Sequence, residues 1–148
     1  MEQRISLITL AVEDLPRAVQ FYENMGWQAA QTGPGGAAFN MNGTVFGFYP
    51  WDSMAKDMGL DPKLAMRPRM TLGYNVREKA EVAQIVMHAE THGGSILKPA
   101  HDIFWGGHSG FFADPDGHMW EVAFNPFSPV AEDGEFHRST EACSTKTS

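Results

Sequence analysis

Glu121 is the residue of this chain best suited to do chemistry. It lies in the alternating run 119–124, which predicts a strand with Glu121 on the face opposite Trp120 and Val122. A carboxylate held in an apolar pocket has a raised pKa and can act as a general acid or base. It can equally pair with a cationic group of a ligand or with an internal arginine such as Arg69. Catalysis and structural pairing are therefore both open for Glu121.

The residues before this strand form a strong turn signal. The tetrapeptide 114–117, Asp-Pro-Asp-Gly, combines a proline that presets φ at a turn corner with a glycine that tolerates positive φ. Apolar runs at 108–112 and 118–124 flank it. The segment therefore predicts a β-hairpin whose second strand carries Glu121.

Histidines supply the other candidate chemistry. His101 and His108 lie in or near the loop and strand that lead into the hairpin, so either could reach a site that contains Glu121. A metal site built from Glu121 with His101 or His108 is an alternative hypothesis. His88 and His92 are one helical turn apart on a predicted helix, and a solvated helix face explains them better than a metal site.

Composition bounds the class of protein. The chain has 148 residues, 43% of them hydrophobic and 20% charged, which fits one ordinary globular domain with a sizeable core. The net charge of −7 argues against nucleic-acid binding, which needs a basic face. The single cysteine, Cys143, allows no internal disulfide, and no membrane span or targeting segment is visible. We expect a cytoplasmic protein.

The order strand, helix, strand, strand, strand occurs twice along the chain. Alternating and helical apolar spacing predicts this order in a first module at about 5–50 and again in a second module at about 69–127. The expected elements are strands at 5–12, 27–32, 37–41 and 44–49 with a helix from Asp14 to Gly26, then strands at 70–76, 95–98, 108–112 and 118–124 with a helix at 78–91.

Two further segments complete the organisation. The insert at about 51–68 contains Trp51, Met54 and Met58 and predicts a short helix that packs on the surface. Residues 1–127 are expected to form a single domain, followed by a polar tail at 128–148. We expect the tail to be held by its own domain or by a partner subunit.

The paired modules resemble the vicinal oxygen chelate superfamily, which includes glyoxalases, bleomycin resistance proteins and extradiol dioxygenases. The similarity rests on the segment 10–15 (Leu-Ala-Val-Glu-Asp-Leu), on Phe21-Tyr22, on Gly26, and above all on 114–117 followed by Trp120-Glu121. It implies an α+β fold in which two βαβββ modules form a cup-shaped curved sheet with the helices outside. It also implies a homodimer, or modules fused in one chain.

The resemblance implies a metal site that this sequence has largely lost. Family members bind a divalent metal with a His on the first strand, a Glu on the fourth, a His or Gln on the fifth and a Glu on the eighth. Here those positions are Leu7, a stretch at 46–48 without a carboxylate, Thr71 and Glu121. One carboxylate cannot hold a catalytic metal, which generally needs three protein ligands. We therefore predict no cofactor and disfavour a divalent metal.

The cup that the resemblance implies has a largely apolar expected lining, which is the ordinary composition of a small-molecule site. Strand alternation and loop position together predict its ligand-binding residues, with Glu121 as the tentative catalytic group. These residues are Leu7, Thr9, Phe46, Phe48, Thr71, Trp105, His108 and Met119.

Three functions fit these observations. The first is a glyoxalase-like protein that binds a small, largely apolar molecule in a cup lacking most metal ligands. The second is a glyoxalase-like lyase or isomerase, or another dioxygenase-superfamily enzyme, which uses either a metal or Glu121 as acid or base. The third is a non-catalytic interaction protein with a filled cup. In each case we expect no nucleic-acid or membrane partner.

Overall fold

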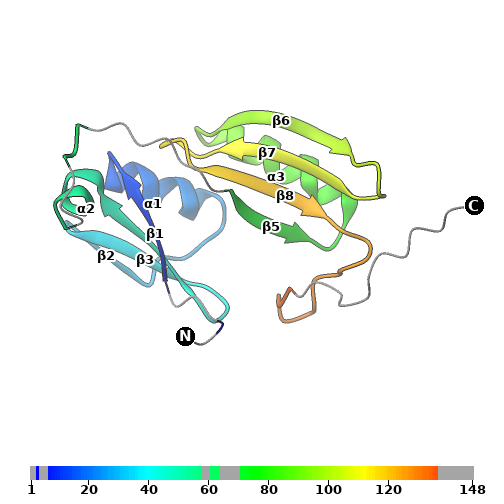
Figure 1. Ribbon diagram of the computed structural model, residues 1–148, viewed down its shortest axis with the longest axis horizontal. Helices are drawn as coiled ribbons and strands as arrows, with labels where there is room; N and C mark the ends of the chain where they lie inside the picture. The colour runs from blue at the N-terminus through cyan, green and yellow to red at the C-terminus, as the bar shows by residue number, and fades with distance from the viewer. Residues whose placement is uncertain (1–2, 4–6, 58–60, 64–70, 137–148) are drawn as a thin grey trace, which may run out of the picture.

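The computed structural model describes residues 3, 7–57, 61–63 and 71–136 and contains two modules of similar element order (Figure 1). Module one comprises β1 (Leu7–Val12), α1 (Leu15–Asn24), β2 (Gln31–Gly33), β3 (Gly36–Asn40) and β4 (Val45–Pro50), and α2 (Trp51–Asp57) follows it. Module two comprises β5 (Leu72–Val76), α3 (Lys79–Thr91), β6 (Ser95–Asp102), β7 (His108–Ala113) and β8 (Met119–Phe124).

Local sequence explains where α1 begins and ends. The carboxylate of Asp14 accepts a hydrogen bond from the backbone N–H of Arg17 at 2.9 Å, and a proline occupies the first turn. Gly26 closes the helix with φ of +105°. The strand predicted at 27–32 is shorter than expected, since β2 contains only Gln31–Gly33. The preceding Trp27 instead turns its ring into the core, where it stacks on Tyr22.

Each module forms one four-stranded sheet. Sheet A has the strand order β1-β4-β3-β2 and sheet B the order β5-β8-β7-β6. In both sheets the first strand of the module pairs in parallel with the last, and the remaining pairs are antiparallel. The α+β class and the two βαβββ modules predicted from the sequence are confirmed.

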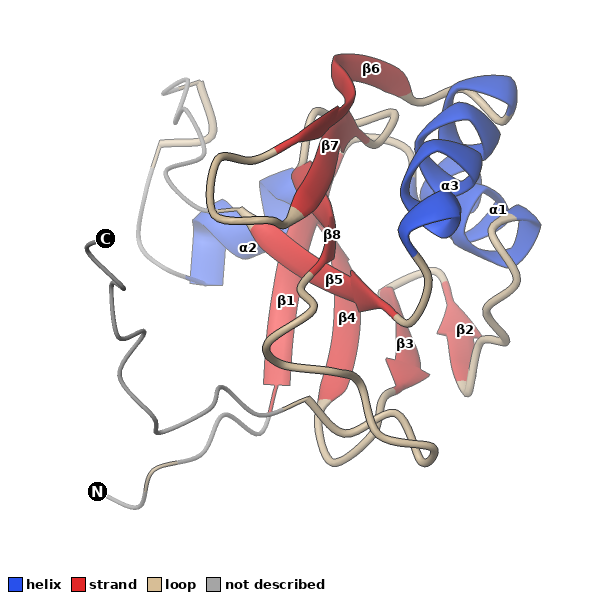
Figure 2. Cartoon of the chain, turned by 90° about the vertical axis from the view of Figure 1, so that its right-hand side faces the viewer, coloured by secondary structure: helices blue, strands red, loops and turns tan. Residues whose placement is uncertain are grey.

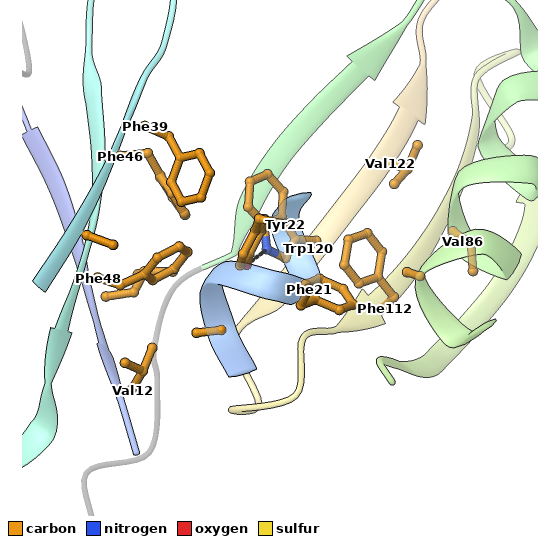
Figure 3. Packing of buried hydrophobic residues seen from close by; sticks show 14 of the residues in the cluster. Val12, Phe21, Tyr22, Phe39, Phe46, Phe48, Val86, Phe112, Trp120 and Val122 are labelled. Atoms are coloured by element: carbon orange, nitrogen blue, oxygen red, sulfur yellow. Dashed lines mark hydrogen bonds between the residues drawn. The ribbon is translucent and has the colours of Figure 1, made fainter. Parts of the chain in front are cut away.

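The two modules share one hydrophobic core, and α1 lies at its centre (Figure 3). Tyr22 of α1 stacks on Phe48 of sheet A at a ring distance of 4.9 Å, and it lies 6.1 Å from Trp120 of sheet B. Phe46 and Trp120 also meet directly, at 5.7 Å. The helix-bearing faces of both sheets therefore border the same core.

The other faces of the two sheets, which we call the open faces, turn away from this core. Figure 1 shows α1 between the strands of sheet A and those of sheet B, with α3 behind sheet B. Figure 2 shows both helices on one side of sheet B. Because the helix-bearing faces meet at the core, the open faces do not face each other within one chain.

The insert and the start of the tail both pack on this framework. The helix expected in the insert is α2, and the indole N–H of Trp51 donates to the Pro62 carbonyl at 2.6 Å. Arg77 donates to the carbonyls of Ala131 and Glu132, so the first part of the tail is held by its own domain. Residues 137–148 lie outside the described part. Among the helices that the structure describes, none is long and apolar enough to cross a lipid bilayer.

Candidate functional site

The open face of sheet A is a groove with a floor of small residues. Leu7 and Thr9 of β1 are exposed there, as predicted by alternation with the buried Leu10 and Val12. Gly47 lies beside them on β4, paired with Thr9. The groove has a volume of about 470 Å³. Sheet A therefore offers space for a ligand next to two of the predicted binding residues.

The rings of Phe46 and Phe48 turn away from this groove into the core, although Phe48 borders the groove. The parallel register pairs them with Ile8 and Leu10, so they share the helix-bearing face of sheet A. Their exposed fractions are only 3% and 2%, and both rings pack around Tyr22. The physical reason is strand alternation, which gives the intervening position on the open face to a glycine.

The open face of sheet B carries Glu121. The sheet register places it between Phe111 of β7 and Gly73 of β5, with Met119 and Ala123 two residues away on the same face. Glu121 is partly buried, and its side chain makes no hydrogen bond or ion pair with any residue that the structure describes. Arg69, the partner considered from the sequence, lies outside the described residues.

Two further predicted binding residues, Thr71 and Trp105, form no hydrogen bond with Glu121 in the described part of the chain and do not line the groove of sheet A. Thr71 is exposed just before β5, and the residue opposite Glu121 in the register is Gly73. Trp105 lies in the β6–β7 loop, 37% exposed, with its ring 6.5 Å from that of Phe127. The structure brings neither of these side chains into the groove of sheet A.

Neither His108 nor His101 forms an ion pair or a hydrogen bond with Glu121 in the part of the chain that the structure describes. His108 lies four residues before Phe112 on β7 and therefore shares its helix-bearing face. There its Nδ1 lies 2.8 Å from a carboxylate oxygen of Asp102. Lys79 and His108 bind this carboxylate and hold the pKa of Asp102 below its usual range. His101 instead bonds to the Pro99 carbonyl.

The donor set of the open faces does not fit the metal site that the fold class implies. The residues at the four metal-ligand positions are Leu7 on the first strand, Gly47 on the fourth and Glu121 on the eighth, with either Thr71 or Gly73 at the fifth-strand position. Within 7–57, 61–63 and 71–136, no group of three or more His, Cys, Asp or Glu side chains could hold a metal ion. A transition metal generally requires three protein ligands, and the described residues of the open faces supply only one.

A second polar site, which sequence reasoning took only for a turn, joins the two modules. The fully buried carboxylate of Asp114 accepts from the Tyr22 hydroxyl at 2.9 Å and lies 2.7 Å from Nδ1 of His118. Two backbone N–H groups of the turn donate to its other oxygen. The Tyr22 hydroxyl in turn accepts from the indole N–H of Trp120 at 3.0 Å. We call these four residues the junction network.

Asp116 adds a second link between the modules. One of its carboxylate oxygens accepts from the Arg17 guanidinium at 3.0 Å and from the backbone N–H of Glu13 at 3.1 Å. Arg17 lies in the first turn of α1 and Glu13 lies just before the helix, whereas Asp116 belongs to the turn of module two. The turn 114–117 therefore fixes module two to the N-terminal end of α1.

Burial and charge set the protonation states in the junction network. Burial, followed by the charge of Asp114, raises the pKa of Tyr22 far above its usual range, so its hydroxyl remains a donor. Burial alone would lower the pKa of His118. The hydrogen bond to Asp114 and the charges of Asp114 and Asp116 outweigh burial, and the pKa of His118 is raised. An imidazolium paired with a buried carboxylate is therefore favoured.

One signal could have revealed this network. Tyr22 occupies a core position of the α1 pattern, and a buried tyrosine hydroxyl needs a hydrogen-bond partner. Few acidic residues of the sequence lie beside apolar runs, and Asp114 is one of them, because it directly follows the apolar run that ends at Ala113. The choice of partner nevertheless depends on how α1 meets β8, which is a property of the tertiary structure.

Known proteins resemble this chain in sequence and in fold. The family model described as Glyoxalase/Bleomycin resistance protein/Dioxygenase superfamily matches residues 4–122. A glyoxalase-related enzyme from Fulvimarina pelagi is 36% identical, with a TM-score of 0.86 over 93% of this chain and 99% of that one.

Two more distant structures share the fold alone. Hypothetical protein SA1046 from S. aureus is 21% identical with a TM-score of 0.72, covering 84% of this chain and 95% of that one. Lactoylglutathione lyase from Agrobacterium tumefaciens is 20% identical with a TM-score of 0.65, covering 84% and 96%. No curated protein matches the chain. The family model spans most of the sequence, and the chain therefore belongs to the glyoxalase/bleomycin resistance protein/dioxygenase superfamily.

Proposed function

We propose that this protein binds a small, largely apolar molecule in a cup formed by the open face of sheet A from one copy and the open face of sheet B from another. The observation that carries the proposal is the position of α1 between the two sheets. Because the open faces of one chain do not face each other, a second copy is needed to close the cup. The functional unit is then a homodimer.

The chemistry of the open faces supports a ligand with a large apolar part. Sheet A contributes Leu7, Thr9 and the bare backbone of Gly47 around a groove of about 470 Å³. Sheet B contributes Met119 and the carboxylate of Glu121. Ligand sites combine an apolar lining with a few polar groups that orient the ligand. Glu121, which has no partner among the described residues, is suited to a cationic or hydrogen-bond-donating group.

A matched pair of probes tests the role assigned to Glu121. Benzylamine and benzyl alcohol differ in charge but hardly in size, and their binding can be followed by NMR shifts of Leu7 and Met119. Replacing Glu121 with Gln should weaken benzylamine about tenfold, the loss of one charge-assisted contact, and leave benzyl alcohol nearly unchanged. Glu90→Gln removes an exposed carboxylate of α3 and is the control. Equal weakening of both probes would contradict the assignment.

Mixing two variants tests the shared cup. Thr9→Trp fills the groove of sheet A, and Glu121→Gln removes the charge of sheet B. In a mixed dimer, one cup combines the intact sheet A of one chain with the intact sheet B of the other. Co-folding the two variants should therefore restore wild-type affinity for benzylamine at one of the two cups of each mixed dimer. No restoration, despite dimers by analytical ultracentrifugation, would show that the open faces act separately.

Metal removal tests whether the proposed ligand binding depends on a metal ion. The open faces supply one carboxylate, so binding of benzylamine should not change after dialysis against a chelator. Titration with Zn²⁺ or Mn²⁺ should not restore or increase it. A stoichiometric metal that survives dialysis and is released by Glu121→Gln would overturn this part of the proposal.

The free carboxylate also favours a second candidate, a lyase or isomerase in which Glu121 moves a proton. The glyoxalase-related enzyme from Fulvimarina pelagi makes this class relevant. Lactoylglutathione, the compound in the name of one fold neighbour, is the probe. Turnover that is lost in Glu121→Gln while binding persists would support catalysis, because Gln retains the shape but cannot exchange the proton.

A further inference from the structure

We infer that the protein has a second small-molecule site, an aromatic pocket between the two modules, and that it takes a neutral ligand with a single aromatic ring. The pocket lies among α1, α3 and the helix-bearing face of sheet B. It is distinct from the open faces proposed above, since its lining shares no residue with the groove of sheet A. The two sites can therefore be tested independently.

Aromatic rings from both modules form the aromatic pocket. Tyr22, Phe112 and Trp120 are buried and make its floor. Trp27 of module one forms one wall, and its ring lies 5.8 Å from that of Trp120 at an angle of 71°. Figure 3 shows Tyr22 and Trp120 at the meeting point of the modules. Rings at such angles offer both edges and faces, which an aromatic guest engages better than an aliphatic one.

The volume and charge of the aromatic pocket define the ligand class. It measures about 110 Å³, and apolar protein cavities of about 150 Å³ take up benzene. Among the described residues that line it, none is Lys, Arg, Asp or Glu. A charged ligand would lose hydration without gaining a counter-charge. Because the pocket is smaller than that benchmark, one ring is the largest ring system that we expect it to take, and the ring should be neutral.

His88 of α3 supplies a polar group at the wall of the aromatic pocket. Its Nε2 lies 3.1 Å from the Asn24 carbonyl, which can only accept, so Nε2 carries the hydrogen. In the neutral ring, Nδ1 is then an acceptor, and it has no hydrogen bond to any described residue. If Nδ1 is the atom of His88 that meets the ligand, a hydroxyl or N–H on the ligand gains an acceptor, so we take a phenol-like ring as the test ligand.

Phenol is the probe, and cyclohexanol is its control of equal ring size and the same hydroxyl. Phenol should raise the melting temperature in a saturable way, with a Kd on the order of 1 mM for so small a ligand, and cyclohexanol should bind at least several-fold more weakly. Nuclear Overhauser contacts should join phenol ring protons to the indoles of Trp27 and Trp120. These contacts need no variant, so the test holds even if a variant fails to fold.

A filling substitution completes the test. Ile85 lines the aromatic pocket from α3, whereas Met87 on the same helix is 62% exposed and does not line it. Ile85→Trp should weaken phenol at least tenfold, and Met87→Trp should leave it unchanged. Absence of saturable binding, contacts only to the open-face residues Leu7 and Met119, or equal affinity in Ile85→Trp would each overturn the inference. None of these results bears on the cup, whose test is the difference between benzylamine and benzyl alcohol at Leu7 and Met119.

Discussion

Asp114 and Glu121 belong to one hairpin, Asp114 to its turn and Glu121 to the middle of β8, and they have opposite surroundings. Asp114 is fully buried, and its two oxygens meet the Tyr22 hydroxyl, His118 and two backbone N–H groups. Glu121 lies on the open face of sheet B and has no partner among the residues that the structure describes. Two carboxylates close in sequence therefore meet opposite electrostatic conditions.

The difference between the two carboxylates shows that one hairpin can carry a residue that stabilises the fold and another that is available to a ligand. A buried carboxylate is tolerated only when its hydrogen bonds are satisfied, and Asp114 is satisfied by groups from both modules. The junction network therefore fixes how the modules meet. A partly buried carboxylate without a partner contributes little to the fold and is available to a ligand, which is the role we propose for Glu121.

The largest expected effect is that of removing the Asp114 carboxylate. Asp114→Ala leaves the Tyr22 hydroxyl, His118 and two backbone N–H groups without an acceptor, so the free energy of unfolding should fall by about 3 kcal/mol or more. Chemical denaturation followed by tryptophan fluorescence measures it. The control Asp102→Ala removes an exposed carboxylate that also pairs with a histidine, and it should have a much smaller effect. Equal effects would refute the distinction.

Removal of the Tyr22 hydroxyl should have a smaller effect. Tyr22→Phe keeps the ring in the core but leaves the Trp120 indole N–H without its acceptor, which should cost about 1–3 kcal/mol of unfolding free energy. Tyr74→Phe, whose ring is 46% exposed, should change stability by less than about 0.5 kcal/mol. A Tyr22→Phe variant as stable as the wild type would show that the junction network does not join the modules energetically.

The pH dependence of stability should reveal His118. Its pKa is raised in the folded protein, so its stabilising contribution is fully present below the unfolded pKa of about 6.5. That contribution is lost as the pH rises through the folded pKa. Denaturation midpoints of the wild type should therefore fall more steeply than those of His118→Gln above pH 6.5. Parallel curves, or an NMR titration of His118 with a lowered pKa, would contradict this.

The smallest expected effect on stability is that of Glu121. Glu121→Gln removes a charge without a partner among the described residues, so unfolding free energy should change by less than about 0.5 kcal/mol. Differential scanning calorimetry at neutral pH measures it. A loss comparable to that of Tyr22→Phe would mean that Glu121 has a structural partner, and the contrast with Asp114 would disappear.

Much of the fold could be predicted from local patterns. The helix from Asp14 and the hairpin around 114–117 depend on capping and turn residues that act within a few positions, and both occur. The shorter β2 could not be predicted, because Trp27 is drawn into a core to which both modules contribute. Tertiary packing there overrides the local preference for a strand.

The candidate site was less predictable than the fold. Alternation identified the open-face positions of Leu7, Thr9 and Glu121 correctly, because each strand fixes its own two faces. It did not reveal that the rings of Phe46 and Phe48 point into the core, because the register with β1 decides which face of β4 meets α1. One residue of shift reverses every side chain of a strand.

The sequence by itself determined the α+β class and the repeated module, since these depend on residue type and short-range spacing. Only the tertiary structure decided that α1 lies between the sheets, that Asp114 joins the modules and that the open faces turn away from each other. Those features depend on contacts between residues about a hundred positions apart. Such contacts follow from how whole faces pack, which no local pattern encodes.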